Sequence, residues 1–336
     1  MDESITGLLS PGEGASLRGW YLWGMAFVRA VQGPENPGLT ALVKALTLLG
    51  SELFYIPAVL FIYWCVDERK GQRLVLLLLL STWLNTALKD LLKQPRPYFL
   101  DPSVGRARAS GYGLPSGHAQ QSLVFWAAAL APRKPAWIIA GAVSLVMAFT
   151  RLYLGVHFPT DLAAGWLLAL GILALSALFW VPLGSLPSVG SLLNAGSTRM
   201  RMIALAGAAF VMNALYGADR SLGALFLGFG AGYTLMIRSF PFSAAAPGAS
   251  PLPAWLHRLL RFALGAAGAF LIYRGFGVFR ELFAAASSFL GAAELGRFLH
   301  YGLLGLWASA GAPWLFLRLR LASYQEQEKQ PHTRKS

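Results

Sequence analysis

Long apolar runs, bounded by charged residues or by proline and glycine, recur along this chain from about residue 51. A run of about 20 residues spans the hydrocarbon core of a bilayer as a helix, in which every backbone group is paired internally. The sequence therefore predicts an all-α fold, a polytopic transmembrane helical bundle. Residues 281–293 are a weaker candidate for a re-entrant helix or a tenth span. We expect about nine spans, over residues 51–66, 74–93, 118–132, 136–155, 160–182, 202–218, 221–237, 259–278 and 297–318.

The composition supports a membrane protein. Of the 336 residues, 56% are hydrophobic and 13% are charged, whereas soluble domains carry about 25% charged residues. The net charge of +13 is scattered between apolar runs and forms no basic stripe. This pattern argues against nucleic-acid binding and favours basic loops beside anionic lipid. Cys65 is the single cysteine, so an intrachain disulfide is excluded.

The chain divides into four expected regions. Residues 1–50 carry short aromatic and amphipathic stretches that suit interfacial helices, and residues 51–182 form a core that holds the polar motifs. Residues 183–320 supply additional transmembrane helices, within which the Ser-, Ala-, Pro- and Gly-rich residues 239–256 form a flexible loop. Residues 321–336 form a polar cytoplasmic tail, which we expect to be disordered from Tyr324.

Basic residues cluster in one set of short loops, and this sets the expected orientation. Short loops rich in Lys and Arg face the cytoplasm. With nine spans, the amino terminus and the three polar motifs then lie on the opposite, periplasmic or lumenal, face. The loop residues that carry this argument are Arg69, Lys70, Arg73, Arg133, Lys134, Arg199, Arg201, Arg238, Arg258 and Arg261.

Three short polar motifs interrupt the apolar pattern at the ends of expected spans. They are Lys89–Pro97, Pro115–His118 and Thr150–Asp161. Lys89 and Arg96 lie seven residues apart, which places them on one helix face where prolines end the span. Because successive spans alternate in direction, all three motifs fall at the same membrane face. Clustered charge at a bilayer edge is costly, so it indicates function.

The cations and small donors in these motifs suit a phosphate group. Lys89, Arg96 and Arg151 supply charge and hydrogen-bond donors for phosphoryl oxygens, the arginines with bidentate geometry. Ser116 is a good helix N-cap, and Gly117 lets a phosphate approach the backbone at a helix N-terminus. We expect these five residues to bind the substrate phosphate.

Two histidines supply the reaction chemistry. His157 is the candidate nucleophile, and Asp161 is expected to hold the other ring nitrogen and stabilise the imidazolium. His118 is expected to protonate the leaving oxygen and then to activate water. Asp90 and Asp101 are isolated, so the sequence offers no acidic cluster suited to magnesium. We therefore expect neither a metal nor another cofactor.

These motifs resemble the pattern of the type 2 phosphatidic acid phosphatase (PAP2) superfamily: Lys-x6-Arg-Pro, then Pro-Ser-Gly-His, then Ser-Arg-x5-His-x3-Asp. Thr150 replaces the usual serine and keeps its hydroxyl. The resemblance covers residues 38–182, roughly half of the chain, and implies a helical catalytic core, metal-independent hydrolysis and a phosphohistidine at His157. The pattern is matched at Lys89, Arg96, Pro97, Pro115, Ser116, Gly117, His118, Arg151, His157 and Asp161.

The expected function is hydrolysis of a lipid phosphate or diphosphate, because a phosphate site at the bilayer edge suits a substrate whose tail stays in the membrane. Candidates are phosphatidate, phosphatidylglycerol phosphate, polyprenyl diphosphate and sphingoid phosphates.

The span count looks like the glucose-6-phosphatase branch, and the extra carboxy-terminal spans look like the sphingosine-phosphate phosphatases. A soluble-substrate phosphatase is therefore the alternative. A vanadate haloperoxidase or an anion transporter fits less well, since the former are soluble and the latter need no nucleophile. The oligomeric state stays open.

Further polar residues lie near the motifs. Asn85 precedes Lys89 by one turn, where it could orient the lysine or form a hydrogen bond between helices. Arg106 and Arg108 lie in the 98–114 loop, where they could contact an anionic head group or simply be solvated. Four aromatic residues could shape the pocket mouth or form an interfacial belt: Tyr98, Phe99, Tyr112 and Tyr153.

Overall fold

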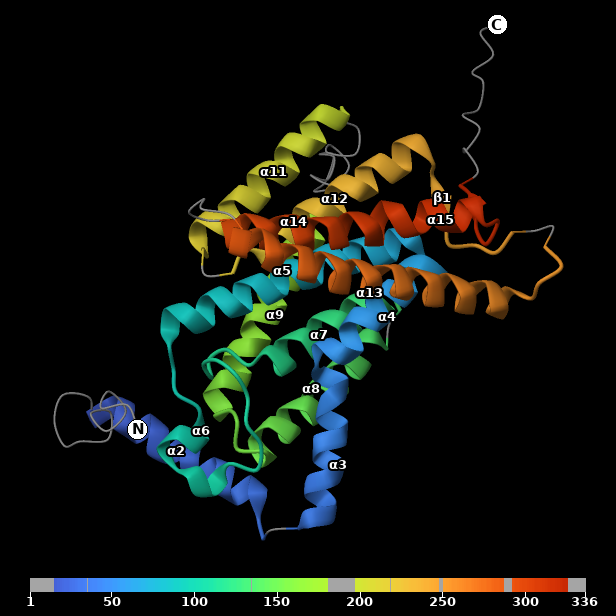
Figure 1. Cartoon of the computed structure of the whole chain (residues 1–336). Coiled ribbons are helices and arrows are strands. Elements are labelled where there is room, and N and C mark those ends of the chain that lie inside the picture. Colours follow the sequence, from blue (N-terminus) through green and yellow to red (C-terminus); the bar gives the residue numbers. More distant parts are fainter. Residues whose placement is uncertain are drawn as a thin grey trace, which may run out of the picture. The chain divides into compact units, whose positions relative to one another are not determined.

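The computed structural model describes residues 15–34, 36–133, 135–180, 197–217, 219–247, 250–286 and 292–325. These residues are almost entirely helical (Figure 1), as the sequence predicts. They divide into two compact units. The first unit comprises Met1–Val59, Leu74–Ser197 and Val211–Leu222, and the second comprises Leu60–Arg73, Thr198–Phe210 and Gly223–Ser336.

Helices follow one another closely along both halves of the chain. The amino-terminal half contains α2 (Ala15–Gln32), α3 (Pro37–Thr47), η1 (Leu48–Gly50), α4 (Glu52–Cys65), α5 (Glu68–Leu92), α6 (Pro97–Leu100), η2 (Pro102–Val104), α7 (Gly117–Leu130), α8 (Ala136–Tyr153) and α9 (Pro159–Trp180). The carboxy-terminal half contains α11 (Thr198–Leu215), α12 (Ser221–Ser239), α13 (Ala254–Ala286), α14 (Ala292–Leu306), η3 (Trp307–Gly311) and α15 (Ala312–Arg318).

Several of these helices can cross a membrane. The pair Pro37–Gly50 and Glu52–Cys65, bent by 41°, counts as one more candidate if it forms a single span. The described residues thus contain five candidate spans, or up to six, and the expected nine are not confirmed. The five helices that are long and apolar enough are Glu68–Leu100, Ala136–Tyr153, Pro159–Leu178, Ser221–Ser239 and Ala254–Val278.

Three of the nine expected spans are not among these six candidates, the bent pair included. Residues 118–132 form α7, which has 14 residues and a rise of about 21 Å, less than the ~30 Å hydrocarbon core. Residues 202–215 lie in α11, which ends at Leu215, and residues 297–318 form a helix that the π-helical turn η3 interrupts. Residues 281–293 begin as the end of α13, while 287–291 lie outside the described residues.

The helix α7 is central to the first unit, because it packs against both α8 and α9 (Figure 1). The approach is close: a Cβ on Gly165 of α9 would lie 2.6 Å from the carbonyl oxygen of Ser116. The indole of Trp166 donates to the Ser144 hydroxyl (2.7 Å), which donates to the carbonyl of Ala119 (2.9 Å). These contacts bring the start of α7 to the start of α9, where two of the motifs lie.

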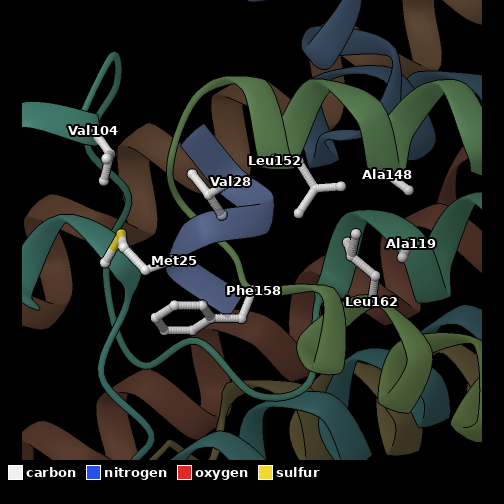
Figure 2. Packing of buried hydrophobic residues seen from close by; sticks show 8 residues of the cluster. All are labelled: Met25, Val28, Val104, Ala119, Ala148, Leu152, Phe158 and Leu162. Atoms are coloured by element: carbon white, nitrogen blue, oxygen red, sulfur yellow. The ribbon is translucent and has the colours of Figure 1, made fainter. Parts of the chain in front are cut away.

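The amphipathic helix α2 covers the loop between α8 and α9. A Cβ on Gly24 would lie 2.7 Å from the Phe158 ring, so α2 lies directly against the residue that follows His157. Its opposite face exposes Trp20, Leu22, Trp23 and Phe27, as an interfacial helix would. The buried cluster through which α2 packs on the rest of the unit comprises Met25, Val28, Val104, Ala119, Ala148, Leu152, Phe158 and Leu162 (Figure 2).

The second unit contains the only strands among the described residues. Strands β1 (Phe242–Ser243) and β2 (Ser323–Tyr324) pair in antiparallel fashion. The Glu68 carboxylate supports this pair, because it accepts from the Ala244 N–H and from the Gln325 side chain, each at 2.9 Å. A partly buried carboxylate needs such donors, so the strand pair and Glu68 stabilise each other.

This pairing corrects the expectations for two segments. The composition of residues 239–256 predicts a flexible loop, and the polar tail is predicted to be disordered from Tyr324. Phe242 is nevertheless fully buried, and Tyr324 belongs to a paired strand. Tertiary hydrogen bonds, which local composition does not reveal, order both segments there. The remaining tail residues, 326–336, lie outside the described residues.

Candidate active site

The first motif forms where α5 ends. Lys93 adopts a left-handed conformation (φ 49°), and its N–H donates to the Lys89 carbonyl at 2.9 Å, which closes the last turn. Arg96 is extended, and Pro97 starts the short helix α6. Lys89 therefore lies in the last turns of α5 and Arg96 just beyond its end, as the proline positions predict.

Two cations of this motif, Lys89 and Arg96, hold the 110–113 segment through backbone carbonyls. The Lys89 ammonium donates to the carbonyls of Tyr112 (2.8 Å) and Gly113 (3.1 Å). The Arg96 guanidinium donates to those of Gly111 (2.8 Å) and Ser110 (2.7 Å). Arg96 is only 3% exposed, so these bonds offset the cost of burying its charge. The two cations thus order the loop that faces the third motif.

The third motif presents His157 with a defined orientation. Its Nδ1 lies 3.0 Å from Asp161 Oδ2, which also accepts the Phe158 N–H at 2.9 Å. Its Nε2 lies 3.2 Å from Arg96 Nη1. Gly155 (φ 67°) makes the turn, where a Cβ would collide with a backbone carbonyl of the 98–114 loop. Asp161 therefore holds Nδ1 and leaves Nε2 directed at the guanidinium.

His157 is buried beside several cations. Burial, and then the charges of Arg96, Arg151 and Lys89, lower the pKa of His157 well below its usual range. His118 acts on the His157 pKa in the same direction, so residues from all three motifs are close enough to interact there. The lowered pKa favours the neutral imidazole, in which the Nε2 lone pair faces Arg96 Nη1.

The second motif starts α7 at Gly117. The Ser116 N–H donates to the Asp161 carbonyl at 2.9 Å, which joins the second and third motifs. Ser116 takes the N-cap position, but its hydroxyl makes no capping bond. Among the described residues, Ser116 Oγ and Arg151 Nε are buried without a hydrogen-bond partner. Two buried, unsatisfied donors from different motifs suit an anion.

Asn85 connects helices through its side chain. Its side-chain amide donates to Gln120 Oε1 (2.7 Å) and to the Pro115 carbonyl (3.2 Å). A Cβ on Gly117 would lie 3.3 Å from Asn85 Oδ1. Of the two roles left open for Asn85, the structure favours the hydrogen bond between helices, which fixes the start of α7.

The loop arginines also have structural contacts. Arg106 donates to the carbonyls of Gln32 and Gly33 at the end of α2, both at 3.2 Å, and lies 4.3 Å from the centre of the Tyr153 ring. Arg108 lies 4.8 Å from the centre of the Tyr98 ring. Arg106 therefore ties α2 to the 98–114 loop, instead of being a merely solvated charge.

Three residues near the site are not among the residues expected there from the sequence. Gln94 donates to Asp161 Oδ1 at 3.0 Å, and the Thr47 hydroxyl accepts from Arg151 Nη1 at 2.9 Å. Gly50 lies against the His118 ring. Thr47 and Gly50 belong to a stretch whose amphipathic pattern predicts only an interfacial helix. Gln94 stands inside the first motif, and its position there is the one signal that could have singled it out.

Gly50→Ala should impair the site, because the added Cβ would lie 2.7 Å from His118 Cδ2 and 2.7 Å from Met147 Sδ. We expect turnover to fall about 10- to 100-fold, since a displacement near 1 Å of a reacting group has effects of this size. Steady-state kinetics of purified protein would measure it. Gly141→Ala is the matched control, because nothing lies within 4 Å of a Cβ there. Equal activity in the two variants would contradict the role of Gly50.

No three His, Cys, Asp or Glu side chains of the described part of the chain are grouped to hold a metal ion. The groups near His157 are instead the cations Lys89, Arg96 and Arg151, and Ser116 is joined to Asp161 through its N–H. This donor set suits an anion with several oxygens, such as a phosphate.

Two family models match the chain. One, described as the PAP2 superfamily, matches residues 71–184, and the other, described as PAP2 superfamily phosphatase, transmembrane extension, matches residues 221–324. Undecaprenyl-diphosphatase of Sulfolobus acidocaldarius is 32% identical over 145 residues, which cover 41% of this chain and 69% of that protein. The chain is an integral membrane protein with several apolar helices. It belongs to the PAP2 superfamily.

Two further relatives have names that differ from that of the Sulfolobus acidocaldarius protein. Sphingosine-1-phosphate phosphatase 2 of Mus musculus is 31% identical over 155 residues, 43% of this chain and 43% of that protein. Phosphatidylglycerophosphatase B of Bacillus subtilis is 29% identical over 155 residues, 40% of this chain and 72% of that protein. The match thus spans less than half of the mouse protein.

Proposed function

We propose that this protein is a membrane phosphatase that hydrolyses a lipid phosphate or diphosphate through a phosphohistidine at His157. The observation that carries the proposal is the orientation of the imidazole, with Nδ1 on Asp161 and Nε2 facing Arg96 Nη1. A neutral imidazole in this orientation offers its lone pair where a guanidinium would hold a phosphoryl oxygen.

The reaction would have two steps. Nε2 of His157 attacks phosphorus, the bond to the leaving oxygen breaks, and His118 gives that oxygen a proton. Water then attacks phosphorus, His118 takes its proton, and the P–N bond breaks to release inorganic phosphate. Asp161 stabilises the cationic ring in both steps. Lys89, Arg96, Arg151, Ser116 and the Gly117 N–H would hold the phosphoryl oxygens.

The relatives support a lipid substrate, since their names refer to sphingosine 1-phosphate, undecaprenyl diphosphate and phosphatidylglycerophosphate. The helix α2 lies against the His157 loop, and its opposite face exposes aromatic side chains, which also suits a site at the lipid interface. We place the site on the extracytoplasmic face, because the basic loops are expected in the cytoplasm. A soluble sugar phosphate is the alternative substrate.

The test is phosphate release by detergent-purified protein from a panel of substrates, each with and without a chelator. The panel contains sphingosine 1-phosphate, undecaprenyl diphosphate, phosphatidylglycerol phosphate, phosphatidate and glucose 6-phosphate. We expect turnover of at least one lipid, unchanged by the chelator, because protein cations neutralise the phosphate. Turnover of the sugar phosphate alone would exclude the lipid class, and strict metal dependence would exclude this mechanism.

A further inference from the structure

Asp161 has two carboxylate oxygens with different partners. Oδ2 accepts from His157 Nδ1 (3.0 Å) and from the Phe158 N–H (2.9 Å), whereas Oδ1 accepts from Gln94 Nε2 (3.0 Å). Asp161 is fully buried. A buried carboxylate is costly without donors, so both oxygens need partners for the group to stay ionised. The Gln94 amide supplies the donor on the side away from the histidine.

The backbone around Gln94 holds its side chain in this place. The carbonyl of Gln94 accepts the Gly113 N–H at 2.8 Å, and Pro95 restricts Gln94 to an extended conformation. A Cβ on Gly113 would lie 3.0 Å from Asp161 Oδ2 and 3.4 Å from the Gln94 carbonyl oxygen. The Lys89 ammonium holds the other side of this segment at the Gly113 carbonyl. The first motif and the 110–113 segment therefore enclose the Asp161 carboxylate.

We propose that Gln94 is a positioning residue, which fixes the Asp161 carboxylate so that Oδ2 stays on His157 Nδ1 and Nε2 points to the phosphorus. The amide orientation is set by chemistry, because an ionised carboxylate only accepts and the NH2 group must face it. A neutral donor holds the carboxylate without adding a charge that would compete with the imidazolium. This inference rests on the proposed phosphohistidine mechanism.

The kinetic test uses Gln94→Met, which keeps the length of the side chain and removes the donor. We expect kcat to fall about 10- to 100-fold, as for other residues that orient a reacting group through a ligand, with KM changed less than about twofold, since Gln94 does not contact the phosphate. Gln121→Met is the matched control, because it removes an amide that bonds Thr82 at 2.9 Å, outside the site. Equal loss of kcat in both variants would reduce Gln94 to a structural role.

Gln94→Glu gives a readout that a structural role would not produce. At neutral pH two carboxylates would face each other, and turnover should fall further than in Gln94→Met. As the pH falls, the pair of carboxylates takes up one proton, and the Glu side chain can then donate to Asp161 Oδ1. The activity of Gln94→Glu relative to wild type should then rise toward low pH. A constant ratio across the pH range would overturn the proposal.

A spectroscopic measurement separates this inference from the proposed function. In protein carrying isotope-labelled histidine, the Nδ1–H resonance of His157, assigned by its loss in His157→Ala, should shift in Gln94→Met and not in Gln121→Met. A shift without any lipid phosphatase activity in the wild type would refute the function and leave the positioning role standing. Normal turnover with no shift and no loss of kcat in Gln94→Met would refute the positioning role alone.

Discussion

Replacing His157 with alanine should abolish phosphate release, by roughly 10⁴-fold or more, the scale seen when a hydrolase loses its nucleophile. The Asp161 carboxylate keeps the Phe158 N–H and the Gln94 amide as donors, so the buried charge stays paired. We therefore expect the variant to fold and insert. Phosphate release and size-exclusion chromatography in detergent would measure the two effects. His257→Ala, in the second unit, controls for loss of a histidine as such.

The same residue should set the acid limb of the pH profile. Burial and neighbouring cations lower the pKa of His157. The neutral, nucleophilic form therefore persists as the pH falls, and kcat/KM declines only once the pH passes below the usual histidine value. An acid limb centred at or above about pH 6.5 would contradict a buried His157 nucleophile. Full activity of His157→Ala would contradict the proposed phosphohistidine mechanism.

Arg96→Lys should have the second largest effect, although it preserves the charge. The guanidinium donates at once to the carbonyls of Ser110, Gly111 and Val156, and faces His157 Nε2. A lysine ammonium cannot reproduce this planar fork. We expect kcat to fall about 100- to 1,000-fold, as when one transition-state donor is lost. Unpaired buried carbonyls should also lower the free energy of unfolding by about 1–3 kcal/mol.

Kinetics and thermal unfolding of the purified variant would measure both losses. Arg108→Lys is the control, because Arg108 is exposed and its cation can remain over the Tyr98 ring as lysine. Wild-type stability together with wild-type turnover in Arg96→Lys would show that charge alone suffices at this position. That outcome would contradict the geometric role given to the guanidinium.

The amount of the fold that the sequence predicts differs between the two halves. Helix class and the ends of α5, α8 and α9 follow from apolar runs and from prolines, which are local signals. The nine expected spans are not confirmed, because α7 has only 14 residues, and burial in protein or in lipid gives similar apolar patterns. In the second half no motif singles out a role, yet the transmembrane-extension model matches residues 221–324.

Within the candidate site, the sequence predicts the motif residues, and the structure brings several of them together. The spacing of Lys89, Arg96 and His157 along the chain predicts that they lie at one membrane face. The partners of these residues were not predictable, because they are far away in the chain. Thr47 contacts Arg151 across 104 residues, and Gln94 contacts Asp161 across 67. Nothing local distinguishes such a threonine from a solvated one, and only the place of Gln94 inside the first motif could have singled it out.

The sequence by itself therefore determined a helical membrane protein of the PAP2 superfamily, and it predicts cations for a phosphate and two histidines to transfer it. The physical reason is that charged residues in apolar surroundings are costly, so their presence there indicates a role. Their spacing is fixed by the covalent chain and can be read from the sequence. Only the tertiary structure decided how these side chains are oriented and which partners hold them. Gln94 on Asp161, Gly50 against His118 and Glu68 beneath the strand pair all depend on packing between distant segments. Such contacts form only when the helices are assembled.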